Sequence, residues 1–179
     1  VDIVDCAMDS FSGGTSQPCL GSLVESLKNT ERVSSLNIEE VRDISNYWQS
    51  VRKLYIAFDE GVNFPASEVY LHEMPGGQYT NLKFQSQSLG LGEDWQKVKN
   101  AYAAANRALG DIVKVTPSSK VVGDLAQFMV ANNIETEHTL VERAAELNFP
   151  SSVVEFLQGF IGHPVGGFPE PLRSRVVKD

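Results

Sequence analysis

The spacing of apolar residues after Asn37 is the feature that most constrains the fold of this chain. Six of them recur at alternating steps of three and four residues: Val41, Ile44, Trp48, Val51, Tyr55 and Phe58. Because an α-helix turns once every 3.6 or so residues (about 100° per residue), this spacing places them along one face of a single long helix. Asn37 suits the N-cap of that helix, and Glu40 suits its first turn. We therefore predict a long helix whose aromatic-rich seam is a packing surface.

The rest of the chain repeats the helical pattern. Helices are predicted over residues 78–90, 93–109, 117–131 and 152–157, with a shorter acidic helix around Leu140. Gly110 suits a C-cap, and Pro117 suits the first position of a helix, where a missing N–H costs nothing. Ser152 and Glu155 have the spacing of a capping box. Ile112 to Val115 reads as a brief extended run, and "EVYLHEMPGG" reads as a short extended segment or a turn. The rest of this part of the chain is predicted to be mostly helical.

The beginning of the chain has a different pattern. Val1 to Asp5 reads as a short apolar strand, and the stretch "MDSFSGGTSQPCLGS" that follows is crowded with glycine and hydroxyl residues. A helical stripe comes next at Leu20, Leu23, Val24 and Leu27. Pro18 suits the first position of that helix, so strand, loop and helix make one βα unit. Because a strand needs neighbours to pair its backbone groups, we expect this sequence to be part of a longer polypeptide.

Charge and composition limit the classes of function. The 179 residues carry a net charge of −8 at pH 7, and no basic run is longer than two residues. Binding to nucleic acid or to an anionic membrane needs clustered cations, so we expect neither partner. No apolar run approaches the roughly 20 residues that cross a bilayer. Cys6 and Cys19 form no Cys-x-x-Cys pair, and we expect packing cysteines in a reducing compartment: the cytoplasm or, in a eukaryote, the mitochondrial matrix.

Few side chains cluster in the pattern of a catalytic site. Asp5 and Asp9 lie at the C-terminal end of the predicted strand, the end where α/β folds place their sites. The three histidines, His72, His138 and His163, are isolated in the sequence. We therefore predict no metal site within this chain, and no spacing indicates Ser-His-Asp chemistry.

The loop "SGGTSQP" is the remaining candidate site. It precedes a helix N-terminus, whose N–H groups favour an anion, but it lacks the lysine and the spacing of a P-loop. The Thr15 hydroxyl both donates and accepts hydrogen bonds, so it suits proton transfer. From the residues alone, a structural turn and a ligand-contacting loop both remain open.

Four long segments resemble the pyruvate carboxylase family: "VDIVDCAMDSFSGGTSQPCLGSLVESL", "YLHEMPGGQYTNLKFQ", "GDIVKVTPSSKVVGDLAQFMV" and "FPSSVVEFLQGFIGHPVGGFPEPLRSRVVKD". The resemblance implies a mainly α chain that begins with the last βα unit of a (β/α)8 barrel, at residues 1–34. A helical funnel extension of the same carboxyltransferase domain would follow at 35–134, and the start of a central allosteric and tetramerisation domain at 135–179. The implied activity is carboxyl transfer from carboxybiotin to pyruvate, which gives oxaloacetate.

The resemblance also implies roles for the loop. In the family, the threonine of the "TSQP" motif moves a proton between pyruvate and biotin, and here that residue is Thr15. Ser16 and Gln17 would line the same substrate and biotin pocket. Biotin would be attached to a carrier domain outside this chain, and a divalent metal such as Zn or Mn would have its ligands outside it too. ATP and Mg would act only at the biotin carboxylase domain, so we expect the isolated chain to be inactive towards pyruvate.

The implied partners are pyruvate, the biotin carboxyl carrier domain, the rest of the barrel and the other subunits of a homotetramer. Two alternatives stay open. An oxaloacetate decarboxylase α subunit or a transcarboxylase subunit would share the barrel, although "TSQPCLGS" and "GGFPEPLRS" fit pyruvate carboxylase better. The second alternative is that the isolated chain acts as a helical assembly or scaffold module.

Overall fold

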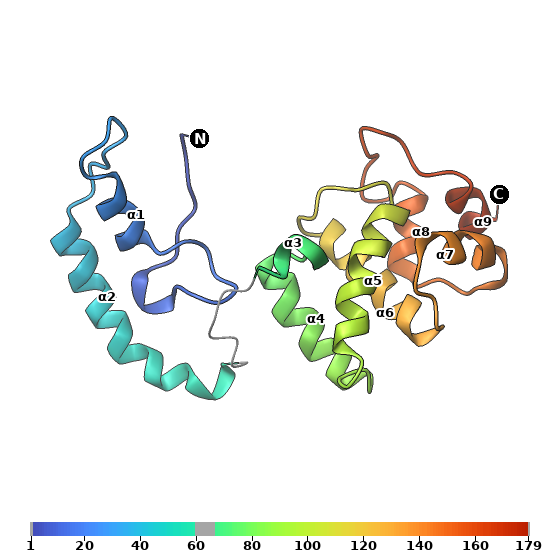
Figure 1. Ribbon diagram of the computed structural model, residues 1–179, viewed down its shortest axis with the longest axis horizontal. Helices are drawn as coiled ribbons and strands as arrows, with labels where there is room; N and C mark the ends of the chain where they lie inside the picture. The colour runs from blue at the N-terminus through green and yellow to red at the C-terminus, as the bar shows by residue number, and fades with distance from the viewer. Residues whose placement is uncertain (1, 60–66, 179) are drawn as a thin grey trace. The chain divides into compact units, whose positions relative to one another are not determined.

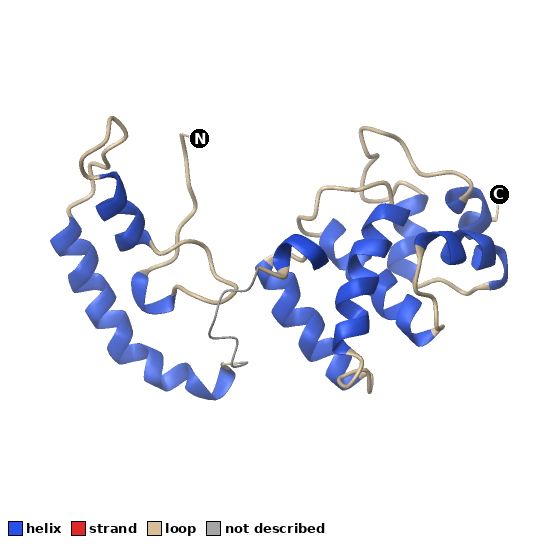
Figure 2. Ribbon diagram, viewed as in Figure 1, coloured by secondary structure: helices blue, strands red, loops and turns tan. Residues whose placement is uncertain are grey.

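The computed structural model describes residues 2–59 and 67–178, and the chain forms two compact units, Val1–Ala66 and Ser67–Asp179 (Figure 1). The regular elements within the described residues are all helical (Figure 2), which confirms the mainly α class. None of these helices is long and apolar enough to span a bilayer. The boundary after Ala66 lies inside the segment 35–134, and the division into segments 1–34, 35–134 and 135–179 stays a prediction.

The first unit consists of a loop and two helices. A short 3-10 turn, η1 (Asp9–Phe11), leads into the loop, and α1 (Leu20–Leu27) follows it. The long helix of this unit is α2 (Ile38–Arg52), and the 3-10 helix η2 (Lys53–Phe58) continues from its end. Cys19 is the N-cap of α1, so Pro18 precedes the helix and does not occupy its first turn as predicted.

The strand predicted at Val1–Asp5 is wrong for this structure. Residues 2–6 have no regular structure, and the strand-like contact nearest to them is an isolated parallel bridge between Ala7 and Cys19. A strand exists only where a second strand pairs with its backbone groups, and residues 2–59 supply no such strand. The assignment of residues 1–34 to a (β/α)8 barrel therefore stays a prediction.

Helix α2 begins as the sequence predicts and ends earlier. The Asn37 side chain accepts a hydrogen bond from the Glu39 N–H at 3.0 Å, which confirms the N-cap. After Arg52 the chain tightens into η2, so the predicted single helix is divided in two. The seam is largely open within this unit: Val41 is 6% exposed, whereas Phe58 is 79% exposed.

The second unit is a bundle of helices. It begins with α3 (Val69–His72), α4 (Gly76–Ser88), α5 (Trp95–Ala108) and α6 (Ser118–Ala131). It continues with α7 (Glu137–Arg143), the 3-10 turn η3 (Ala144–Glu146), α8 (Ser151–Leu157) and α9 (Leu172–Val177). The most extensive helix pair is α5 with α6, and these two helices supply much of the core.

The core explains why this unit is stable. Tyr102 of α5 and Leu125 of α6 are fully buried, and burial of a side chain such as leucine contributes roughly 1.5–3 kcal/mol. Both helices end at residues with a left-handed backbone near their C-termini, Gly110 at φ +89° and Asn133 at φ +54°. These two ends confirm the predicted helix terminations.

Three local predictions in this unit are wrong. Ile112–Val115 forms no strand, and Pro117 is the N-cap of α6 and not its first helical residue. Ser152 makes no capping box, because its hydroxyl donates to Asp124 Oδ2 of α6 at 2.5 Å. The packing of α8 against α6 supplies that acceptor, and a local sequence pattern cannot reveal it.

Candidate functional site

The loop between η1 and α1 is closed by backbone hydrogen bonds at its two ends. The Ala7 N–H donates to the Pro18 carbonyl at 2.9 Å, and the Leu20 N–H donates to the Ala7 carbonyl at 2.9 Å. Together they form the parallel bridge between Ala7 and Cys19. The loop therefore leaves this point of the backbone and returns to it.

The Asp9 carboxylate joins the loop to the start of α1. Its Oδ1 atom accepts a hydrogen bond from the Gly21 N–H at 2.7 Å. Gly21 lies in the first turn of α1, where N–H groups have no partner inside the helix and where negative charge is favourable. A Cβ atom on Gly21 would lie 2.2 Å from Asp9 Oδ2, so a side chain at this position would displace the carboxylate.

The tip of the loop is a turn built on two glycines. Gly13 and Gly14 have φ of +106° and +55°, a region that side chains disfavour. The Ser16 N–H donates to the Gly13 carbonyl at 3.0 Å, and the Gly13 N–H donates to Ser16 Oγ at 2.9 Å. Ser16 Oγ in turn donates to the Gln17 carbonyl at 2.7 Å. The Ser16 hydroxyl is therefore engaged inside the turn.

Thr15 lies on the same turn with its hydroxyl unengaged. The residue is half-buried, and its side chain has no hydrogen-bond partner within residues 2–59 and 67–178. A hydroxyl offers one donor and two acceptor positions, so Thr15 can both give and take a proton. The structure brings Thr15, Ser16 and the exposed Gln17 together, and their roles towards a ligand stay predictions.

Helix α2 holds η1 through both backbone groups of Ser10. The Ser10 N–H donates to Ser45 Oγ at 3.1 Å, and Arg52 Nη1 donates to the Ser10 carbonyl at 2.7 Å. Trp48 packs edge-on against Phe11, with ring centroids 5.8 Å apart. Sequence reasoning missed these contacts, because the hydrogen-bonded partners are 35 and 42 residues apart and no local spacing connects them.

The side chains of the described residues do not fit a metal ion. Within residues 2–59 and 67–178, no group of three or more His, Cys, Asp or Glu side chains is arranged to hold one. The Asp9 carboxylate instead accepts the Gly21 N–H. In the Thr15 loop, the hydroxyl of Thr15 has no hydrogen-bond partner among the described residues, so it is free to contact a ligand.

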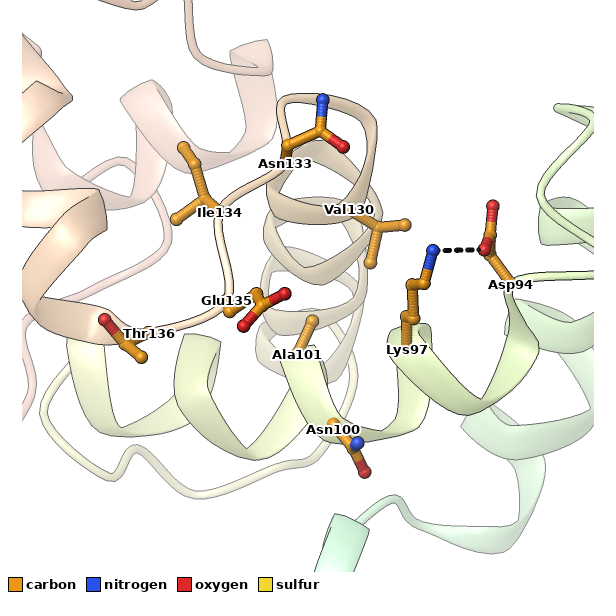
Figure 3. Close-up of a pocket in the computed structure, with 9 residues that line it drawn as sticks. All are labelled: Asp94, Lys97, Asn100, Ala101, Val130, Asn133, Ile134, Glu135 and Thr136. Atoms are coloured by element: carbon orange, nitrogen blue, oxygen red, sulfur yellow. Dashed lines mark ion pairs between the residues drawn. The ribbon is translucent and has the colours of Figure 1, made fainter.

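A pocket of about 430 Å³ in the second unit is another candidate. Figure 3 shows its lining, which comes from α5, the end of α6 and the segment that enters α7. Lys97 Nζ lies 2.8 Å from Asp94 Oδ1, and this hydrogen bond raises the pKa of Lys97, so the amine stays protonated. The nine lining residues include no histidine or cysteine. The pocket has room for a small molecule, and its charged lining residues are Asp94, Lys97 and Glu135.

Two buried polar side chains, Lys99 and His72, also lie in this unit, and each has a hydrogen-bond partner. Lys99 Nζ donates to Glu68 Oε2 at 2.5 Å, which lowers the pKa of Glu68. His72 is 6% exposed, and its Nδ1 atom accepts the Met74 N–H at 3.0 Å. Burial and then the charge of Lys99 lower the pKa of His72, which favours the neutral ring that can accept this bond. These contacts stabilise the second unit and expose no reactive group.

Comparison with known proteins connects the loop to an enzyme family. Residues 69–179 match the family described as "Conserved carboxylase domain". The chain is 56% identical over 178 residues to pyruvate carboxylase of Aspergillus niger and 56% identical over 180 residues to mitochondrial pyruvate carboxylase of Rattus norvegicus. Each match covers 99% of this chain and 15% of the relative, so the chain spans a small part of these proteins.

Solved structures give the same result. The carboxyl transferase domain of Rhizobium etli pyruvate carboxylase matches with a TM-score of 0.91 and 55% identity, over 99% of this chain and 30% of that one. A structure of the same domain with pyruvate and biocytin matches with a TM-score of 0.89 and 53% identity, over the same shares of the two chains. The Thr15 loop and the second unit thus lie in a segment whose fold is shared with that domain.

Proposed function

Because this chain belongs to the conserved carboxylase domain family, we propose that it is the segment of a biotin-dependent pyruvate carboxylase that brings Thr15 to the carboxyltransferase site. The reaction is the transfer of a carboxyl group from carboxybiotin to pyruvate, which gives oxaloacetate. The names of the relatives, and the pyruvate and biocytin in the Rhizobium etli domain, support this proposal.

Thr15 carries a proton in this reaction. Pyruvate forms the new C–C bond through its methyl carbon, which must lose a proton as the enolate develops. The Thr15 hydroxyl accepts that proton and donates its own to the ureido nitrogen of biotin from which the carboxyl group has left. Biotin supplies the carboxyl group, the broken N–C bond is replaced by the new C–C bond, and the protons balance.

The observation that carries the proposal is that the Thr15 hydroxyl is unengaged, whereas the neighbouring Ser16 hydroxyl is hydrogen-bonded within the same turn. A proton carrier has to accept and donate within one cycle, and a hydroxyl already bound inside the loop does not have both positions available. Ser16, the neighbouring hydroxyl, is bound in this way. The proposal therefore selects Thr15 over Ser16 as the proton carrier, with Ser16 and Gln17 contributing to the pocket wall.

In the proposal, the metal ligands and the domains that carry biotin and use ATP lie outside this chain. The metal, Zn or Mn, has its ligands on the rest of a (β/α)8 barrel that residues 1–34 complete, and residues 35–134 form the funnel to the site. Biotin arrives on its carrier domain, ATP and Mg act at the biotin carboxylase domain, and residues 135–179 take part in a homotetramer.

The enzyme is cytoplasmic or in the mitochondrial matrix. The isolated chain is inactive, and its coverage of only 15% of the relatives supports this.

The structure of the second unit favours a supporting role for it in the same enzyme. Its core is continuous through α5 and α6, and its buried Lys99 and His72 are engaged within the unit. The second unit would therefore act as a scaffold within the enzyme. The pyruvate carboxylase relatives favour that enzyme over an oxaloacetate decarboxylase α subunit or a transcarboxylase subunit.

The proposal is tested in the full-length protein that contains this chain, by pyruvate-dependent decarboxylation of oxaloacetate with free biotin. Thr15→Ala should lower kcat by about 100-fold or more, because general acid–base catalysis contributes about 10²–10⁴-fold. Thr15→Ser keeps the hydroxyl and should retain turnover.

Thr30→Ala is the matched control, because the Thr30 hydroxyl donates to the Leu27 carbonyl at the end of α1 and has no part in the loop. Normal turnover in Thr15→Ala, with pyruvate binding retained, would contradict the proposed role.

A further inference from the structure

We propose that Ser45 and Arg52 of α2 are positioning residues for the Thr15 loop. The inference rests on the proposed function of Thr15 and extends it to a helix that is distant in sequence. Its basis is Ser10, which lies five residues before Thr15 and whose two backbone polar groups are both bound by side chains of α2.

The two bonds fix the orientation of Ser10 as well as its place. Ser45 Oγ accepts the Ser10 N–H at 3.1 Å, and Arg52 Nη1 donates to the Ser10 carbonyl at 2.7 Å. Arg52 also pairs with Asp59, at 3.6 Å between Nη2 and Oδ2, so a second contact orients its guanidinium group. A backbone residue that is bound through its donor and its acceptor has little freedom to rotate or shift.

The contacts come from one face of a rigid helix. Ser45, Trp48 and Arg52 follow one another at i, i+3 and i+7 in α2, which places them in line along the helix. Between the two hydrogen bonds, Trp48 packs against Phe11. We call these three side chains the α2 clamp. Because one helix carries all three, the clamp holds η1 as a unit.

The loop needs an external anchor, because its own bonds fix its shape and not its position. Gly13 and Gly14 adopt positive φ angles and have wide conformational freedom. The bonds between Gly13 and Ser16 close the turn upon itself. The bridge at Ala7 and the Asp9–Gly21 bond tie the loop to α1, and the α2 clamp ties it to a second helix.

The clamp acts on catalysis through the place of the Thr15 hydroxyl. A misplacement of about 1 Å lowers the rate by as much as about 100-fold, because a proton passes only between aligned groups. Pyruvate binding depends on groups outside this loop in the proposed enzyme. Loss of the clamp should therefore lower kcat and leave KM for pyruvate nearly unchanged.

The test is steady-state kinetics of pyruvate carboxylation by the full-length protein. Ser45→Ala and Arg52→Ala should each lower kcat by about 10- to 100-fold. The kinetic isotope effect on kcat with methyl-deuterated pyruvate should rise, because proton transfer becomes more rate-limiting. Arg52→Lys keeps a donor for the Ser10 carbonyl and should recover most of the rate. Ser45→Ala and Arg52→Lys are small changes, so they decide the test even where Arg52→Ala does not fold.

Arg42→Ala is the matched control, because Arg42 also lies on α2 but pairs with Glu25 and Glu39. Arg42→Ala should have kinetics close to those of wild type. If Ser45→Ala and Arg52→Ala behave like this control, the inference is overturned. A loss of kcat with an unchanged isotope effect and no recovery in Arg52→Lys would also overturn it, since a general loss of structure gives that result. Normal turnover in Thr15→Ala would instead contradict the proposed function itself.

Discussion

Asp9 and Gly21 approach each other so closely that a side chain at position 21 would displace the Asp9 carboxylate. The Gly21 N–H donates to Asp9 Oδ1 at 2.7 Å, and a Cβ atom on Gly21 would lie 2.2 Å from Asp9 Oδ2. The bond joins the first residue of η1 to the first turn of α1, across twelve positions of sequence. It is one of the anchors that fix the loop on which Thr15 lies.

Gly21→Ala should therefore destabilise the first unit although alanine is the better helix former. The methyl group displaces the Asp9 carboxylate, and loss of a hydrogen bond to a charged acceptor costs about 1.5–3 kcal/mol. The gain in helix propensity offsets about 1 kcal/mol of this, so a net loss of about 1 kcal/mol is expected in urea unfolding. In an Asp9→Ala background the methyl group has room, and Gly21→Ala should then be neutral or stabilising. A neutral effect in the wild-type background would contradict the close approach.

Tyr102→Phe should leave the second unit as stable as before or stabilise it by about 1 kcal/mol. The Tyr102 hydroxyl is buried and has no partner among the described residues, so its removal breaks no bond and ends the cost of desolvating it. Burial also raises the pKa of Tyr102 far above its ordinary value. Urea unfolding measures the effect, with Leu125→Ala as the control that should lose about 2–5 kcal/mol. A loss above about 1 kcal/mol in Tyr102→Phe would reveal a bonded hydroxyl.

His72 should make the second unit less stable as the pH falls below about 6.5, the ordinary pKa of histidine. Burial, and then the charge of Lys99, lower the pKa of His72 in the folded state. Below about 6.5 the unfolded chain therefore binds a proton that the folded state rejects, and stability is lost as the pH falls towards the folded pKa. An NMR titration of the His72 ring measures the shift directly.

His72→Asn is the matched variant, because its side-chain oxygen can accept the Met74 N–H and does not titrate in this range. The variant should lose this part of the pH dependence. A His72 titration at or above 6.5 would contradict the assigned burial effect.

The features of the fold that the sequence predicts correctly are helix ends, which depend on local sequence. Asn37 caps α2 through the Glu39 N–H, and Gly110 and Asn133 end α5 and α6 with positive φ angles. Each of these features depends on residues within one turn of the helix end, so a short window of sequence contains all the necessary information.

Two of the wrong predictions depend on distant partners. Ser152 bonds Asp124, 28 residues away, and does not cap its own helix. The strand expected at Val1–Asp5 needs a partner strand that residues 2–59 do not contain. The same reason applies to the site: Thr15, Ser16 and Gln17 stand in one motif, whereas the α2 clamp reaches Ser10 across 35 and 42 residues. Resemblance to a family identifies the motif, and only the fold identifies what holds it.

The most direct measurement of the central claim is exchange of the pyruvate methyl protons with deuterium from solvent, followed by proton NMR in the full-length protein with free biotin. If the Thr15 hydroxyl carries the proton, wild type and Thr15→Ser exchange these protons. Thr15→Ala should exchange them about 100-fold more slowly while it still binds pyruvate. Exchange at the wild-type rate in Thr15→Ala would contradict the claim, and the loop would then be a structural turn.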